Sequence, residues 1–325
     1  MAAAAAAAFS ILTRGPPLDA AARCVANATP ARNVAAFDRA WHTLLRAYLQ
    51  RTPSACRAIT QLDSLGAHVH NDHIAMRSFV DSSGGSGLAF LGEAFTAFGY
   101  APQDDIVIPS LPVNARWYEP PEETSWPKIF VSELRTKELP EHAAAIIFAH
   151  VDGHYGKAAH ERLRGALSAG DGDALAQLLD QPPWTPSAEE VAIVRAADGG
   201  DTALRSATEY ASWTLTHAHR INHLTVLQNV LGAEWGSLRS LNALLVAEGI
   251  EFNPAGGADG LTQGTRALCL EQSSTVADRI PHTFGCGNEQ SVPCAFLELI
   301  ERHEGFRGFL GQNAKGIFES TKMRR

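Results

Sequence analysis

The sequence has few cysteines, no long apolar run and no excess of basic charge. Its five cysteines show no CxxC spacing, which argues against a disulfide framework and favours a reducing compartment. No apolar run approaches the roughly 20 residues that a helix needs to span a bilayer, so an integral membrane protein is excluded. With 27 basic and 35 acidic residues, the net charge of −8 argues against a general nucleic-acid surface, which would need a basic stripe.

What the sequence does contain is a globular composition and many histidines. Its 325 residues, 45% hydrophobic and 19% charged, suffice for one large domain or two ordinary ones with a buried core. Thirteen histidines are present, several of them close together in the chain. Histidine is the commonest metal ligand and titrates near neutral pH, so the question is which of the thirteen carry chemistry.

The first 33 residues differ in composition from the rest. They are rich in alanine and hold three arginines but a single acidic residue. This composition is typical of an organelle transit peptide, but it also fits an alanine-rich extension that is not removed, and both interpretations stay open. A transit peptide would direct the protein to a plastid or mitochondrion, and otherwise we expect the cytoplasm. Residues 34–320 are expected to form a single catalytic domain.

The chain from residue 66 onwards shows the same order of elements twice. Residues 66–135 predict a strand, a helix ending at Gly99 and three short strands. Residues 218–305 predict the same order, with the helix ending at Gly249. The last three strands of the second half are expected at 266–273, around 274–279 and at 294–302. This repetition predicts an α+β fold built from two β-α-β-β-β modules.

The spacing within the two modules supports a true repeat. Twenty-six residues separate His73 from Gly99, and the same number separates His223 from Gly249. Two equivalent strand histidines would face each other across a pseudo-twofold axis, in a β-cup around a metal. Residues 140–215, between the modules, predict a helical insertion. We expect it to be a lid or flanking subdomain rather than part of the reaction centre.

A metal site follows from the two equivalent histidines. Two histidines and one carboxylate can bind Fe(II) on one face and leave positions open for substrate and O₂. Glu298 is the expected carboxylate, because it lies on a strand between apolar neighbours and is costly to bury without a partner. The metal ligands are therefore expected to be His73, His223 and Glu298. Two alternatives stay open: Glu133 as a rival ligand, and a structural ion pair of Glu298 with Arg302 or another basic residue.

Arg77 lies four residues after His73, so both side chains are expected on one face of the strand. A guanidinium there could bind a substrate carboxylate with two hydrogen bonds, although a structural salt bridge is the alternative. We favour the substrate contact, because the same pocket is expected to hold the metal. The remaining clustered histidines are expected near the site or on the surface: His70, His150, His154, His217 and His219.

Several motifs resemble known enzyme families. The segment FLELIERHEGFRGFLGQNAKGIFES (296–320) is similar to the C-terminal end of 4-hydroxyphenylpyruvate dioxygenases. Those enzymes carry an iron-binding Glu strand followed by a helix, which implies a C-terminal helix at about 306–320. NDHIAMR and INHLTV resemble the two His strands of the vicinal-oxygen-chelate superfamily, to which those dioxygenases belong.

A more specific resemblance is to the 2-oxoadipate dioxygenase/decarboxylase, or hydroxyglutarate synthase, family. It rests on HNDHIAMRSF, IFVSEL and SVP and covers roughly residues 36–320. The resemblance implies conversion of 2-oxoadipate and O₂ to 2-hydroxyglutarate and CO₂, in lysine catabolism. It also implies Fe(II) as the cofactor, with His73, His223 and Glu298 as its ligands and Arg77 contacting the 2-oxo acid.

Other functions stay open beside this one. The chain could act on another 2-oxo acid, as 4-hydroxyphenylpyruvate dioxygenases do. It could also be a non-oxidative metal-dependent lyase or isomerase of the same fold, or a metal-free binding protein. The expected partners are a small 2-oxo dicarboxylate and O₂, with no nucleic acid and no membrane. The sequence does not indicate the oligomeric state.

Overall fold

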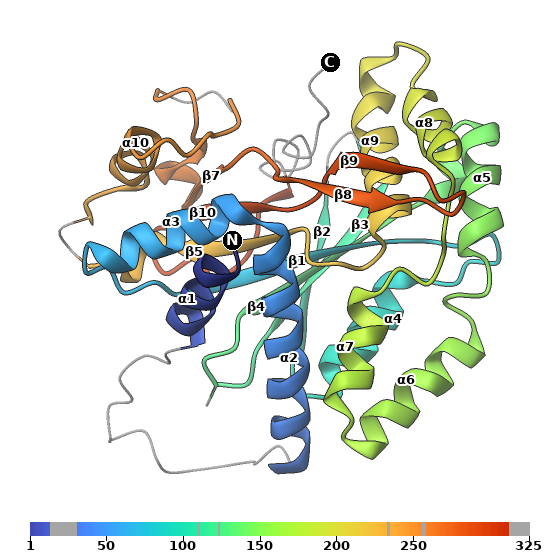
Figure 1. Ribbon diagram of the computed structural model, residues 1–325, viewed down its shortest axis with the longest axis horizontal. Coiled ribbons are helices and arrows are strands. Elements are labelled where there is room, and N and C mark those ends of the chain that lie inside the picture. The colour runs from blue at the N-terminus through green and yellow to red at the C-terminus, as the bar shows by residue number, and fades with distance from the viewer. Residues whose placement is uncertain (14–30, 109–110, 123, 233–234, 255–257, 312–325) are drawn as a thin grey trace.

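A central sheet of eight strands organises the molecule (Figure 1). The computed structural model describes residues 1–13, 31–108, 111–122, 124–232, 235–254 and 258–311. The strand order in the sheet is β2-β3-β4-β1-β5-β10-β7-β6. The strands are β1 (Asn71–Phe79), β2 (Ala101–Val107), β3 (Val113–Glu119), β4 (Lys128–Leu134), β5 (His223–Leu227), β6 (Gln263–Thr265), β7 (Leu270–Ser274), β8 (Arg279–Thr283), β9 (Glu289–Pro293) and β10 (Phe296–Arg302).

The two halves of this sheet have the same connectivity. In the first half β1 pairs in parallel with β4, and β3 joins β4 to β2 through antiparallel ladders. In the second half β5 pairs in parallel with β10, and β7 joins β10 to β6 in the same way. The halves meet where β1 and β5 pair antiparallel. The predicted α+β fold of two β-α-β-β-β modules is confirmed.

The second module differs from its prediction in one strand. The stretch around 274–279 adds no strand of its own to the main sheet, because β7 ends at Ser274 and β8 begins at Arg279. β8 and β9 instead form a separate two-stranded hairpin before β10. The missing edge strand is β6, which precedes β7 and has only three residues. A segment of three residues with a glycine at its centre is too short to show the alternation of apolar and polar residues that predicts a strand.

Each module has one helix after its first strand, and serine caps both helices. In α4 (Gly87–Thr96) the Ser86 side chain accepts a hydrogen bond from the Ala89 N–H, and in α10 (Leu238–Ala247) Ser237 accepts one from Ser240. The chain between the modules is helical: α5 (Glu141–Val151), α6 (Lys157–Ala169), α7 (Gly172–Asp180), α8 (Ala188–Ala196) and α9 (Thr202–His217). Of these, α9 packs against β1 and β4. Single 3₁₀ turns lie at Thr136–Glu138, Gln228–Val230 and Arg266–Leu268.

The N-terminal helices are α1 (Ala2–Thr13), α2 (Ala31–Arg51) and α3 (Pro53–Ser64). α1 packs against both α2 and α3, and its Ala8 and Ile11 side chains are buried. The rest of the predicted N-terminal extension, up to residue 30, lies outside the described residues. Among the described helices, none combines the length and apolarity needed to cross a membrane.

The predicted C-terminal helix does not begin at residue 306. Residues 306–310 form no helix, and the predicted helix from residue 312 onwards lies outside the described part of the chain. The chain turns immediately before this segment, where Glu304 and Gly305 have φ values of 52° and 72°. Successive residues in the left-handed region end regular structure and redirect the chain back over the sheet.

Candidate metal centre

Three strands of the sheet bring His73, His223 and Glu298 together. His73 lies on β1, His223 on β5 and Glu298 on β10, and all three are buried. Glu298 Oε2 is 3.1 Å from His73 Nε2 and 3.3 Å from His223 Nε2. One possible ligand atom from each residue lies within 4.8 Å of the other two. The structure therefore places the three expected ligands in one cluster.

Strand register explains why these side chains converge. His223 pairs with Ala75 of β1 on one side and with Phe296 of β10 on the other. Thr225, two residues later on β5, pairs with His73 and with Glu298. Because side chains two residues apart on a strand share a face, all three expected ligands face the same side of the sheet.

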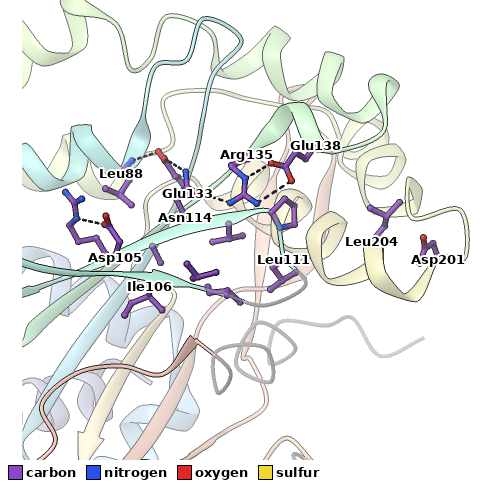
Figure 2. Close-up of a pocket in the computed structure, with 16 residues that line it drawn as sticks. Leu88, Asp105, Ile106, Leu111, Asn114, Glu133, Arg135, Glu138, Asp201 and Leu204 are labelled. Carbon is purple, nitrogen blue, oxygen red and sulfur yellow. Dashed lines mark hydrogen bonds and ion pairs between the residues drawn. The ribbon is translucent and has the colours of Figure 1, made fainter.

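The same register excludes Glu133 as an equivalent of Glu298. His73 pairs with Lys128 as His223 pairs with Phe296, so the counterpart of Glu298 two residues on is Phe130. Glu133 instead lines a surface depression whose lining includes none of the three triad residues (Figure 2). Its carboxylate accepts hydrogen bonds there from the Ser86 hydroxyl, the Leu88 N–H and the Asn114 amide.

A polar residue directly before each histidine orients its ring. Asp72 Oδ2 lies 2.8 Å from His73 Nδ1, and Asn222 Oδ1 lies 3.2 Å from His223 Nδ1. A hydrogen bond at Nδ1 leaves the Nε2 lone pair directed into the cluster, which is the arrangement of metal-bound histidines. The sequence shows both polar residues, but their role depends on contacts that only the folded sheet defines.

Burial and nearby charges set the ionisation of these groups. Burial lowers the pKa of His223 well below its usual range, and the charges of His73 and Arg77 add to this effect. Burial alone would also lower the pKa of His73, but hydrogen bonds to Asp72 and Glu298 outweigh it and raise that pKa. Burial would raise the pKa of Asp72, yet Arg302 and His73 hold it well below its usual range. A neutral His223 has the lone pair that metal binding requires.

The donor set fits a divalent metal. Thr225 Oγ1 donates to Glu298 Oε2 at 2.8 Å and lies 3.1 Å from His73 Nε2. Glu298 Oε1 is buried and has no hydrogen-bond partner among the described residues. A buried carboxylate oxygen without a partner is costly, and a bound cation between the two imidazoles would satisfy it. Arg302 does not pair with Glu298, because its guanidinium binds Asp72 instead.

Arg77 shares the face of β1 that carries His73, as expected, and both residues line one cavity. Its guanidinium carbon lies 5.0 Å from the centre of the Tyr210 ring and 4.9 Å from that of Trp213. Both rings belong to α9, so the helical insertion packs around the Arg77 side chain, although neither ring lines the cavity. Burial lowers the pKa of Arg77 to about 10, while Tyr210 and Glu209 oppose this shift. Arg77 therefore stays cationic near neutral pH.

The cavity beside the triad also contains two amides that the sequence did not single out. Gln272 on β7 and Asn222 before β5 both line it and are almost fully buried. Gln272 Nε2 and Asn222 Nδ2 have no hydrogen-bond partner among the described residues. The cavity is closed by Ile106, Phe130, Phe309 and Leu310, which are apolar. Its wall thus combines one cation and two available amide donors with a largely apolar surface.

Three of the other clustered histidines have structural contacts outside the triad. His219 and His217 are buried, not on the surface: the former contacts the Tyr155 hydroxyl at 2.9 Å and the latter the Pro293 carbonyl. His150 lies 3.1 Å from Glu190 on α8.

Comparison with known proteins identifies the family. Residues 39–304 match the sequence profile of the 2-oxoadipate dioxygenase/decarboxylase family. A chloroplastic/amyloplastic member from Oryza sativa subsp. japonica is 30% identical over 308 residues, covering 85% of this chain and 76% of its own. A chloroplastic member from Arabidopsis thaliana is 28% identical over 301 residues, covering 84% of this chain and 74% of its own.

A solved structure supports the same assignment. The hydroxyglutarate synthase of Oryza sativa, crystallised in complex with 2-oxoadipate, superposes with a TM-score of 0.70 and 27% sequence identity. The match covers 92% of this chain and 98% of that structure. The further likeness to 4-hydroxyphenylpyruvate dioxygenases stays a prediction from the C-terminal motif. The profile match, the two relatives and the shared fold show that this chain belongs to the 2-oxoadipate dioxygenase/decarboxylase family, a family of oxidoreductase enzymes.

Proposed function

We propose that this protein is an Fe(II)-dependent dioxygenase that converts 2-oxoadipate and O₂ to 2-hydroxyglutarate and CO₂, a step of lysine breakdown. The observation that carries the proposal is the buried cluster of His73, His223 and Glu298 beside a cavity that contains Arg77. Two neutral nitrogen ligands and one carboxylate on a single face are typical of non-haem Fe(II) oxygenases. The atoms balance, because one carboxyl carbon leaves as CO₂ and both atoms of O₂ enter the products.

The protein would hold the metal through His73 Nε2, His223 Nε2 and Glu298. Fe(II), when bound, would supply the redox chemistry and open positions for the 2-oxo acid and O₂. Asp72 and Asn222 keep the imidazoles in the orientation that exposes Nε2. The apolar wall formed by Phe130, Phe309 and neighbouring side chains excludes water from the reacting atoms.

Arg77 and the two amides would bind and orient the substrate. Arg77 lies towards one end of the cavity, because β1 continues from His73 past Ala75 to reach it. Gln272 lies towards the opposite end of the cavity. It pairs with Ile300, which is two residues beyond Glu298 on β10, and β10 runs antiparallel to β1. We infer that Arg77 binds the distal carboxylate, while Gln272 donates to an oxygen of the 2-oxo acid group near the metal.

The direct test is anaerobic loading with Fe(II), followed by oxygen-electrode measurements over a panel of 2-oxo acids. We expect oxygen uptake with 2-oxoadipate and one CO₂ and one 2-hydroxyglutarate per O₂ consumed. Uptake with an aromatic 2-oxo acid but none with 2-oxoadipate would contradict the proposed substrate. Turnover of 2-oxoadipate without oxygen uptake would contradict the proposed oxidative reaction.

A substitution at Gln272 tests the assigned amide. Gln272→Glu keeps the size of the side chain but replaces its donor with a negative charge. We expect the KM for 2-oxoadipate to rise about tenfold or more, because a hydrogen bond to a charged group is worth roughly 1.5–3 kcal/mol. Gln263→Glu is the matched control, since Gln263 pairs with Gln272 on the neighbouring strand and does not line the cavity. Equal KM values for parent and Gln272→Glu enzymes would exclude the contact.

A further inference from the structure

The chain after β10 folds back over the cavity beside the triad. Phe309 and Leu310 line that cavity. The Phe309 ring stands edge-on to His73, with ring centres 4.8 Å apart and an interplanar angle of 90°. Phe309 also packs against Phe130 and Trp117 of the first module, at 5.1 and 5.6 Å between ring centres. The segment therefore forms one wall of the site and touches a proposed metal ligand.

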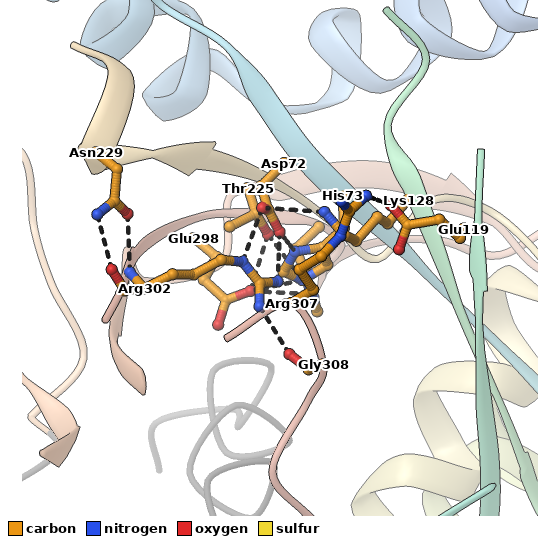
Figure 3. A network of polar contacts seen from close by, with 11 residues as sticks. Asp72, His73, Glu119, Lys128, Thr225, Asn229, Glu298, Arg302, Arg307 and Gly308 are labelled. Atoms are coloured by element: carbon orange, nitrogen blue, oxygen red, sulfur yellow. Dashed lines mark hydrogen bonds and ion pairs between the residues drawn. The ribbon is translucent and has the colours of Figure 1, made fainter. Parts of the chain in front are cut away.

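One arginine connects this segment to the partner of that ligand (Figure 3). Arg302 donates through Nε and Nη2 to the two oxygens of Asp72, at 2.9 and 2.8 Å. Its third nitrogen, Nη1, donates to the Gly308 carbonyl at 2.7 Å, directly before Phe309. The guanidinium carbon lies 5.3 Å from the centre of the Phe309 ring. Asp72 in turn orients His73 through Nδ1.

The geometry of these contacts makes Arg302 hard to replace. Only the planar fork of arginine can bind both carboxylate oxygens and still present a third nitrogen to a carbonyl. The Asp72 side chain is about 1% exposed, so its charge depends on nearby cations. The next cation is Lys128, whose Nζ lies 3.7 Å from Asp72 Oδ1, beyond hydrogen-bond distance. Loss of Arg302 would leave Asp72 loosely held and the segment unattached at Gly308.

We propose that Arg302 is a positioning residue that couples the seating of residues 306–310 over the cavity to the orientation of His73, through Asp72. When the segment is seated, Arg302 fixes Asp72 and the His73 ring is held in its metal-binding orientation. When the segment is displaced, the same guanidinium loses its carbonyl and ring contacts, and its hold on Asp72 loosens. This inference rests on the proposed function, because it takes His73 as a metal ligand.

The test measures metal binding rather than turnover. Apoprotein is titrated with Co(II), and the affinity and the visible ligand-field spectrum are recorded for the parent, Arg302→Gln and Arg302→Lys. We expect Arg302→Gln to weaken Co(II) binding by about 10–100-fold, as for other partners of metal-bound histidines, and to shift the spectrum. Arg302→Lys should recover part of the affinity, since it restores the charge beside Asp72 but not the fork.

Arg51→Gln is the matched control. The Arg51 guanidinium also binds both oxygens of an aspartate, Asp180, but this pair joins α2 to α7 and involves neither Asp72 nor residues 306–310. We expect its Co(II) affinity and spectrum to equal those of the parent. If Arg302→Gln instead lowers the melting temperature while its Co(II) affinity and spectrum stay unchanged, Arg302 is merely structural and the proposal is overturned.

A double-mutant cycle tests the coupling itself. Phe309→Ala removes the ring without changing any ligand, and we expect a smaller loss of Co(II) affinity in the same direction. The losses in Phe309→Ala and Arg302→Gln should not add in the double variant, because they act through one connected set of contacts. Additive losses, or no loss in Phe309→Ala, would overturn the coupling. Parent protein that binds no Co(II), or His223→Ala protein that binds it equally well, would overturn the proposed function itself.

Discussion

Glu298→Gln protein is expected to bind Fe(II) at least about 100-fold more weakly than the parent and to show no oxygen uptake with 2-oxoadipate. The substitution keeps the shape of the side chain but removes the only carboxylate charge of the triad. Changes to the partners of a metal ligand typically cost 10–100-fold in affinity, so loss of a ligand should cost at least as much. Equilibrium dialysis with metal analysis measures the affinity, and an oxygen electrode measures the activity.

Glu133→Gln is the matched control for this experiment. Glu133 is also a buried strand carboxylate, but it binds Ser86, Leu88 and Asn114 instead of the histidines. We expect normal Fe(II) affinity in this variant, whatever the change in its melting temperature. His223→Ala should lose the metal as Glu298→Gln does. If both triad variants bind Fe(II) like the parent, the assignment of the three ligands is wrong.

Arg77→Met is expected to lower kcat/KM for 2-oxoadipate by about 10–100-fold while Fe(II) affinity stays that of the parent. Methionine fills much of the space between Tyr210 and Trp213 but cannot bind a carboxylate. A hydrogen bond to a charged group contributes roughly 1.5–3 kcal/mol, which corresponds to this range of rates. Steady-state oxygen uptake at several substrate concentrations gives the rate constants.

A second substrate shows which carboxylate Arg77 contacts. 2-Oxohexanoate has the same six-carbon chain as 2-oxoadipate, with a methyl group in place of the distal carboxylate. If Arg77 binds the distal group, the parent strongly prefers 2-oxoadipate and Arg77→Met loses that preference. Equal losses on both substrates would mean that Arg77 binds the 2-oxo acid group instead. Loss of Fe(II) in Arg77→Met would show that Arg77 is structural.

The parts of the site that the sequence predicted depend on local spacing. His73, Arg77 and Glu298 can be placed on strand faces because side chains alternate, and His223 follows from the 26-residue interval in each module. The repeat then predicts that the two histidines are equivalent. These inferences rest on alternation and spacing along the chain, so they need no knowledge of which strands pair. The structure brings the three expected ligands together in one cluster.

The parts that the sequence missed depend on contacts between distant segments. Asp72 and Arg302 are 230 positions apart, and no pattern around either residue indicates that they pair. Glu133 looked comparable to Glu298 until strand register showed that Phe130 occupies the equivalent position. The contact between Tyr210 and Arg77 could not be predicted either, because tertiary packing decides where a helical insertion lies relative to the site.

The antiparallel seam between β1 and β5 has a thermodynamic consequence. It is where the two halves of the main sheet pair, and His73 lies on one side of it while His223 and Glu298 lie on the other. An ion held by all three would therefore tie the modules together and bind the folded chain far better than the unfolded one. Its binding free energy would add to the free energy of unfolding, by an amount that grows with the logarithm of metal concentration. The metal concentration would then govern the fraction of the enzyme that is folded as well as the rate at which it turns over substrate.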